Sequence, residues 1–192
     1  METLKKTIVK FFYLEFIWVL LPLGATFIPI DKVSSPHLEN GAANQNRLGK
    51  EDMKFILVVS EGNMMEIKLG ELAQNSALSN QVKKIGKIMI EDHHKTNREL
   101  TVIANAKQIV LAGTLNKKQL KKYNKIAKKK GADFDKAYIE DMIENHKKDI
   151  SVFEKETKDG TDPEIKNWAS NKLAMLKHHL YLANEANAVL KK

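Results

Sequence analysis

From residue 51 to the C-terminus, apolar residues recur at spacings of three and four positions, and proline is nearly absent. This period matches the turn of an amphipathic α-helix, so the chain is predicted to be all-α. Polar interruptions divide the pattern into four long helices and one short helix between the second and third long ones. The predicted helices span about residues 52–75, 80–112, 115–127, 132–158 and 163–190. Long helices with short connections pack most simply as an antiparallel four-helix bundle.

Residues typical of helix ends mark several of these boundaries. Ser79 and Asp133 stand where long helices begin, and each is predicted to accept hydrogen bonds from free backbone N–H groups. Gly113 is predicted to end the second long-helix pattern. Asp162 followed by Pro163 predicts the start of the last helix, because a proline at the first helical position needs no N–H partner.

The first thirty residues differ from the rest of the chain, because three lysines precede an almost continuous apolar run. This layout is typical of a secretory signal peptide, and the run is also just long enough for an N-terminal membrane anchor despite Glu15 within it. Residues 31–50 are polar and are predicted to be a flexible tether to a bundle domain at residues 51–192. Both interpretations predict export to the periplasm or cell envelope.

Composition and charge narrow the possible functions. The chain has 192 residues, a net charge of +8 and no cysteine, which excludes disulfide scaffolds, thiolate metal sites and cysteine nucleophiles. Residues 1–30 carry three lysines and two glutamates, so their removal lowers the charge only from +8 to +7. The basic character therefore belongs to the predicted mature domain.

Lysine supplies nearly all of this excess charge and is spread along the chain, so no nucleic-acid partner is expected. The N-terminus is the segment predicted to associate with a membrane. The lysine-rich segment 117–130 is interpreted as a solvated face. The alternative is salt-dependent binding of that segment to an anionic membrane or a nucleic acid.

One short sequence occurs twice in the predicted bundle. Residues 89–93 read Met-Ile-Glu-Asp-His, and residues 142–146 read Met-Ile-Glu-Asn-His. In both copies the histidine follows an inward methionine by four positions and therefore stays on the apolar face of its helix. His179 and Glu66 occupy comparable positions in the last and first helices. The predicted inward stripe of the first helix also includes Val58 and Gly62. Each long helix thus places one ionisable side chain in the core, and these are Glu66, His93, His146 and His179.

Two explanations of this polar layer follow from its chemistry. A lone buried carboxylate is unfavourable, so Glu66 is expected to contact the imidazoles in both. In the first explanation the four groups form a hydrogen-bonded network that fixes helix register, with Asp92 and Asn145 as flanking acceptors. In the second, Glu66 and the three histidines bind a transition metal such as iron, zinc or copper. Without cysteine, histidine and carboxylate are the only strong ligands that the chain offers.

A conventional di-iron centre is not predicted. Glu91 and His94 have the Glu-x-x-His spacing of di-iron bundles, but Glu91 lies about 200° around the helix from the inward His93. His94 and His178 each stand beside an inward histidine and are predicted to lie at the rim of the core or in solvent. The sequence also lacks a nucleophile elbow, a glycine-rich phosphate loop and a second inward carboxylate. The protein is therefore expected not to be an enzyme.

Several short motifs occur in a specific order between residues 53 and 190. They are residues 66–73 (EIKLGELA), 89–93 followed by Asn97 and Leu100, 134–138 (FDKAY), 142–146, and Leu173 to His179-Leu180 before Ala183. This set resembles an uncharacterised domain of bacterial "predicted outer membrane proteins", a domain of unknown function assigned to the ferritin-like superfamily. The resemblance implies an exported ferritin-like bundle and no particular reaction. The family pattern usually has proline where this chain has Ala174.

Taken together, the sequence predicts an exported, non-enzymatic helical bundle protein with a buried Glu/His layer. The alternative function is that of a transition-metal-binding, redox or stress protein that uses the same four residues. The two functions differ in whether the layer holds a metal ion.

Overall fold

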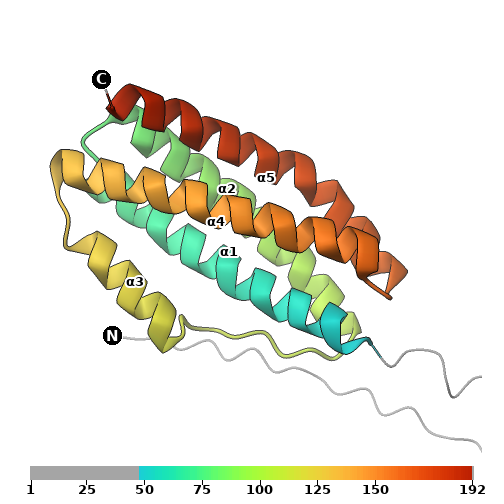
Figure 1. Ribbon diagram of the computed structural model, residues 1–192. Helices are drawn as coiled ribbons and strands as arrows, with labels where there is room; N and C mark the ends of the chain where they lie inside the picture. The colour runs from blue at the N-terminus through green and yellow to red at the C-terminus, as the bar shows by residue number, and fades with distance from the viewer. Residues whose placement is uncertain (1–47, 192) are drawn as a thin grey trace, which may run out of the picture. The chain divides into compact units, whose positions relative to one another are not determined.

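The computed structural model describes residues 48–191, which all belong to one compact unit, Asn44–Lys192. This part of the chain contains five helices and no strand. The helices are α1 (Lys50–Ser76), α2 (Asn80–Ala106), α3 (Lys117–Ala127), α4 (Gly131–Asp159) and α5 (Pro163–Leu190). The four long helices lie side by side, and the short α3 packs against α1 and α4 (Figure 1). The predicted all-α helical bundle is therefore confirmed.

The predicted signal peptide or anchor at residues 1–30 lies outside the described residues, as does nearly all of the predicted tether. Within residues 48–191, no helix combines the length and the hydrophobicity that crossing a membrane requires.

The long helices bury two apolar clusters. In one, the ring of Phe55 packs edge-on against Phe153 with centroids 5.0 Å apart, and Trp168 contacts both rings. In the other, Phe134 stacks on Tyr138 with centroids 6.0 Å apart. Along each long helix, the residues of one cluster give way to those of the other near the predicted ionisable residue. The polar layer therefore lies between two apolar halves of the core.

α1 and α2 approach each other closely at Gly70 and Gly86. A Cβ atom on Gly70 would lie 2.7 Å from the carbonyl oxygen of Gly86, and one on Gly86 would lie 2.9 Å from the Cβ of Ala73. Both distances are shorter than real contacts, so this close approach requires glycine at both positions. Gly70 lies one turn after Glu66, so the contact holds Glu66 against the helix that carries His93.

The predicted end of α2 is wrong by six residues, because the helix ends at Ala106 and Gly113 does not cap it. Gln108 adopts the left-handed conformation with φ of 58°. The N–H groups of Gln108 and Ile109 donate to carbonyl oxygens of the last turn over 3.1 and 2.8 Å, which is a Schellman ending. Ile109 then returns to the core and is 8% exposed. The apolar pattern continues past the helix because the loop itself is partly buried.

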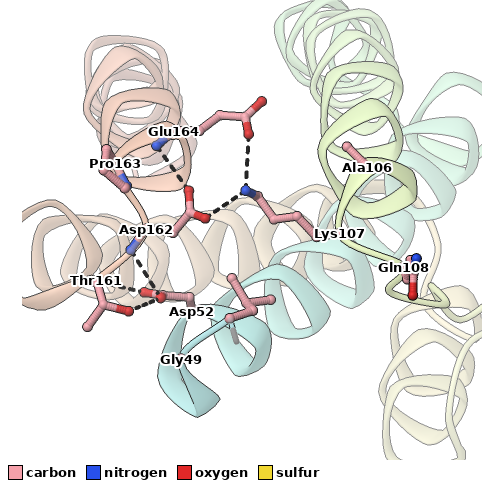
Figure 2. A pocket seen from close by; sticks show the side chains of 10 residues that line it. Gly49, Asp52, Ala106, Lys107, Gln108, Thr161, Asp162, Pro163 and Glu164 are labelled. Atoms are coloured by element: carbon pink, nitrogen blue, oxygen red, sulfur yellow. Dashed lines mark hydrogen bonds and ion pairs between the residues drawn. The ribbon is translucent and has the colours of Figure 1, made fainter. Parts of the chain in front are cut away.

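Ion pairs and hydrogen bonds join the end of α2 to the starts of α5 and α1 (Figure 2). Lys107 Nζ lies 2.6 Å from Asp162 Oδ2 and 3.1 Å from Glu164 Oε2. The Asp52 carboxylate of α1 accepts hydrogen bonds from the N–H and the hydroxyl of Thr161 and from the N–H of Asp162. These residues line a surface depression of about 770 Å³ at this end of the bundle.

The predicted helix caps are partly confirmed. Ser79 accepts a hydrogen bond from the second residue of α2, and Asp162 accepts two from the first turn of α5. Asp133 is not a cap, because α4 already begins at Gly131 and has no side-chain cap. Instead, Asp135 accepts hydrogen bonds of 3.0 and 2.7 Å from N–H groups of the turn between α1 and α2. This contact fastens the turn to α4.

The predicted inward stripe of α1 is also partly wrong. Val58 is 44% exposed and Gly62 is only half-buried, whereas the polar Asn63 is 5% exposed. α1 contacts α2, α3 and α4, so its buried face is wider than one stripe and is turned away from Val58. The consequence is that an amide of α1 lies beside the polar layer.

Candidate metal centre

The four ionisable residues predicted to face the core come together at one level of the bundle. Glu66 of α1, His93 of α2, His146 of α4 and His179 of α5 are each at most 2% exposed. One nitrogen from each of the three imidazoles lies within 4.8 Å of one from each of the others. The centroids of the rings lie 5.2 to 5.9 Å apart. The common level, which sequence spacing alone left open, is thus established.

Each imidazole uses one nitrogen to contact an acceptor outside the cluster. His93 Nδ1 lies 2.8 Å from Asn63 Oδ1, and His146 Nδ1 lies 2.9 Å from the carbonyl oxygen of Met142. His179 Nε2 lies 2.8 Å from Asp92 Oδ2. Because these oxygens accept hydrogen bonds, the three nitrogens are the protonated ones that donate.

Asn63 itself is fixed in orientation. Its Nδ2 group donates to Asn97 Oδ1 over 3.0 Å, which leaves its Oδ1 to accept from His93. The side chains of Asn97, Asn63 and His93 therefore form a chain of hydrogen bonds from the rim of the bundle into the core.

In the neutral rings the remaining imidazole nitrogens carry lone pairs, and these nitrogens face each other or Glu66. His146 Nε2 lies 3.2 Å from His179 Nδ1, and His93 Nε2 lies 2.6 Å from Glu66 Oε2. The other carboxylate oxygen, Oε1, lies 3.5 Å from His146 Nδ1. Neither Glu66 oxygen nor His93 Nε2 makes a well-directed hydrogen bond with the described residues, although the atoms are close. Acceptors thus outnumber donors here, so the cluster needs added protons or a cation.

The pKa shifts of the cluster residues also indicate that the cluster needs an added proton or a cation. Burial alone would raise the pKa of Glu66, but the charges of His93 and His146 outweigh it and lower the pKa to about 2. Burial alone would lower the pKa of His93, but the Glu66 carboxylate outweighs it and raises this pKa. Burial lowers the pKa of His179 to about 4, with the other two imidazoles adding to the effect. A protonated His93 beside an ionised Glu66, with a neutral His179, is the arrangement that these shifts favour at neutral pH.

Two residues near the cluster were not predicted from the sequence. Asn63 supplies the oxygen that accepts a hydrogen bond from His93. The sequence feature that could have identified it is its position three residues before Glu66, on nearly the same face of the helix. Asp149 lies one turn after His146, and burial together with the charge of Glu66 raises its pKa to about 8.

The predicted flanking acceptors have different outcomes. Asp92 accepts from His179 as predicted, and its side chain is 40% exposed. Asn145 does not contact a histidine, because it faces α3, where it accepts from Lys122 and donates to Asp141. The two copies of the repeated sequence thus have different surroundings at the same position.

The residues excluded from the core are indeed exposed. Glu91, His94 and His178 are all exposed to solvent, so the Glu-x-x-His spacing does not contribute to the buried cluster. His94 and His178 therefore serve as natural controls for their buried neighbours.

The fold and the site together define a helical bundle with a buried layer of three histidines and one glutamate. A family described as "Domain of unknown function (DUF4142)" matches residues 37–186, and the chain belongs to this family. The predicted resemblance to an uncharacterised domain family is therefore confirmed. No curated protein matches the sequence significantly.

Two solved structures have a similar fold. A DUF305 fragment from Deinococcus radiodurans has a TM-score of 0.64 and 8% identity, over 75% of this chain and 97% of that chain. CopM in its Cu(II)-bound form has a TM-score of 0.58 and 15% identity, over 71% of this chain and 95% of that chain. At these identities the similarity establishes the fold alone.

Proposed function

We propose that this protein binds a single transition metal ion inside its bundle through His93, His146, His179 and Glu66. The observation that supports the proposal most strongly is the orientation of the three imidazole rings. Each ring directs one nitrogen to a fixed oxygen acceptor and the other to Glu66 or a second ring. Metal-binding histidines typically use their second nitrogen in this way, because the outer hydrogen bond sets the tautomer and the orientation of the ring.

The donor set favours zinc, copper or iron, because neutral imidazole and carboxylate ligands suit these ions. Copper is the first ion to test, because the structurally similar CopM has a Cu(II)-bound form. Two nitrogens that bind one ion through bonds of about 2.0–2.1 Å lie at most about 4.2 Å apart. The imidazole nitrogens of the bundle lie within 4.8 Å of one another, so metal binding requires at most a small inward movement of the rings.

Metal binding also accounts for the charge of the site. A cation coordinated by the three lone-pair nitrogens and Glu66 would take the place of the proton that His93 otherwise carries beside the carboxylate. The competing explanation is a hydrogen-bonded network with a structural role, in which that proton stays. The two explanations differ in a single observable, which is whether the folded protein takes up metal.

The wider role that we propose is that of an exported metal-binding protein without enzymatic activity. The lysines and apolar run of residues 1–30 support export to the periplasm or envelope. The near-complete burial of all four ligands supports binding rather than catalysis, since it leaves little room for a substrate. The order of the two apolar clusters reverses between α1 and α2 and between α4 and α5, but it is the same in α2 and α4, which are connected through α3. This order supports two antiparallel helix pairs joined by one crossover, an arrangement of the ferritin-like kind.

Equilibrium dialysis of the full chain against Cu(II) or Zn(II), followed by elemental analysis, tests the proposal. We expect about one equivalent bound in the wild type and a loss of at least tenfold in affinity in His179→Gln, since a ligand is removed. His178→Gln is the matched control, because it changes the exposed neighbour, and it is expected to bind as the wild type does. Less than about a tenth of an equivalent in a folded wild-type protein would leave the structural network as the better explanation.

A further inference from the structure

One part of the protein surface, separate from the buried histidine cluster, carries a concentrated positive charge. Between residues 101 and 132 the sequence has nine lysines and neither aspartate nor glutamate. Two of these lysines are engaged within the bundle, Lys107 by the start of α5 and Lys122 by Asp141 of α4. The others make no ion pair with the residues that the structure describes, and they are Lys117, Lys118, Lys121, Lys125, Lys128, Lys129 and Lys130.

α3 is held to the bundle by its inner face. Ile126 is 5% exposed in the core, and Gln119 Nε2 donates to the carbonyl oxygen of Glu61 over 2.8 Å. Lys122 Nζ lies 2.5 Å from Asp141 Oδ1. With this side fixed, the opposite side of the helix is presented to solvent.

Lysines recur on that opposite side at spacings of four, four and three. This outer lysine face consists of Lys117, Lys121, Lys125 and Lys128, all of which are exposed. Residues at these spacings share one helix face, so their ammonium groups form a stripe along α3.

The acidic side chains of α4 do not neutralise most of this stripe. They line a groove of about 520 Å³ between α3 and α4, where they meet Lys122, Lys125 and Lys129. Lys117, Lys121 and Lys128 do not line the groove. The positive charge that remains uncompensated therefore points away from the bundle.

We infer that the outer lysine face of α3 binds the phosphate groups of anionic lipids at a membrane surface. Leu120 lies beside the stripe and is 49% exposed, which provides an apolar side chain for contact with the lipid interface. A nucleic-acid partner fits less well, because the segment has no arginine for base recognition. Its aromatic residue, Tyr123, packs against the apolar core rather than offering a stacking surface.

Vesicle flotation of the full chain tests this inference. Retention on phosphatidylcholine vesicles gives a baseline that includes any apolar contribution of residues 1–30, and phosphatidylglycerol is then added to measure the anionic increment. Each lysine near an anionic surface strengthens binding by about fivefold, so K117Q/K121Q/K128Q is expected to lose on the order of a hundredfold of that increment. The control K54Q/K68Q/K84Q changes three exposed lysines elsewhere, lowers the net charge equally, and is expected to keep most of it.

The salt dependence provides a second readout. The increment is expected to disappear between about 0.1 and about 1 M salt, where the screening length falls from about 10 to about 3 Å. An increment that is absent in the wild type, or equal in the two triple variants, would overturn the inference. Retention on duplex DNA that exceeds retention on anionic vesicles and depends on the same three lysines would assign the face to a nucleic acid instead. Metal uptake is measured separately, so neither result depends on the histidine cluster.

Discussion

At the residue scale, Asn63 decides which nitrogen of His93 faces Glu66. Asn97 orients the Asn63 amide, and the amide oxygen then holds the proton of His93 on Nδ1. His93 Nε2 is thereby directed at the Glu66 carboxylate, 2.6 Å away, where it carries the added proton in the metal-free protein and would offer its lone pair to a metal ion. Asn63 is therefore a positioning residue for the proposed ligand set.

Asn63→Ala is predicted to lower the affinity for the metal by about 10- to 100-fold, because loss of an outer hydrogen bond frees the tautomer and ring of His93. Competition with a chelator of known affinity measures the change. Asn75→Ala, at an exposed position of α1, is the control and is expected to leave the affinity unaltered. An Asn63→Ala protein that is folded and binds within about twofold of the wild type would remove Asn63 from this role.

The sequence identified all four members of the polar layer, because an ionisable side chain on an apolar helix face is conspicuous. It missed Asn63 because a neutral amide beside that face carries no comparable signal. It misjudged Asn145 because the repeat suggested the environment of Asp92, whereas α4 faces α3 at that position. A sequence pattern predicts which face of its own helix a residue occupies. It does not predict which neighbouring helix that face contacts.

A second titrating pair lies away from the histidines, where α4 ends. Glu156 is 5% exposed, and its burial together with the neighbouring Asp52 carboxylate raises its pKa to about 7. The folded protein then binds a proton between pH 4.5 and about 7 that the unfolded chain releases, so stability from this group falls as pH rises through that window.

Glu156→Gln is predicted to remove the loss of stability that Glu156 causes as the pH rises. The free energy of unfolding of the wild type should fall relative to that of the variant by roughly 2 kcal/mol as pH rises from about 4.5 to about 7.5. Urea denaturation of both proteins across this range measures the difference, and the subtraction cancels other titrating groups. Parallel pH profiles for the two proteins would contradict the assignment.

At the element scale, the end of α2 shows where sequence patterns stop being informative. Apolar residues continue at helical spacing beyond Ala106, and the periodicity therefore predicted a longer helix. The ion pairs of Lys107 with α5 and the burial of Ile109 in the loop decide the actual end. Both are contacts between elements. Local signals sufficed for the cap at Asp162, where the side chain bonds to its own helix.

The left-handed conformation of Gln108 gives a test of this boundary. Gln108→Gly is predicted to stabilise the protein by roughly 0.5 kcal/mol, because glycine avoids the cost of this conformation but loses more entropy on folding. Gln108→Val is predicted to destabilise it by about 1 kcal/mol or more, since a β-branched side chain is disfavoured there. Chemical denaturation midpoints measure both variants. The same direction of change in both would argue against the Schellman ending.

At the scale of the whole molecule, the polar layer takes one side chain from each long helix and lies between two apolar clusters. An ion bound there would join all four helices at one point. Without an ion, the negative charge of Glu66 is balanced by a proton on His93. The bundle itself follows from helical periodicity, as the sequence predicted. The convergence of the four groups at one level required the helix register, which is set by packing such as the Gly70–Gly86 contact.

Metal binding is predicted to stabilise the whole bundle. At a free metal concentration of 100 times the dissociation constant, the gain is about 2.7 kcal/mol, which corresponds to a rise in melting temperature of roughly 5–10 °C. Because His93 must release its proton and its pKa is raised, the rise should be smaller at about pH 5.5 than at about pH 7.5. Differential scanning calorimetry measures the rise at both values. His179→Gln should show little of it, and an equal rise in that variant would place the metal elsewhere.

The identity of the ligands is the central claim, and X-ray absorption spectroscopy of the full chain loaded with one equivalent of Cu(II) or Zn(II) tests it most directly. We predict a first shell that includes three imidazole nitrogens at about 2.0–2.1 Å, with one imidazole fewer in His179→Gln and no change in His178→Gln. A wild-type spectrum without multiple imidazoles, or one that His179→Gln leaves unchanged, would contradict a metal site formed by His93, His146, His179 and Glu66.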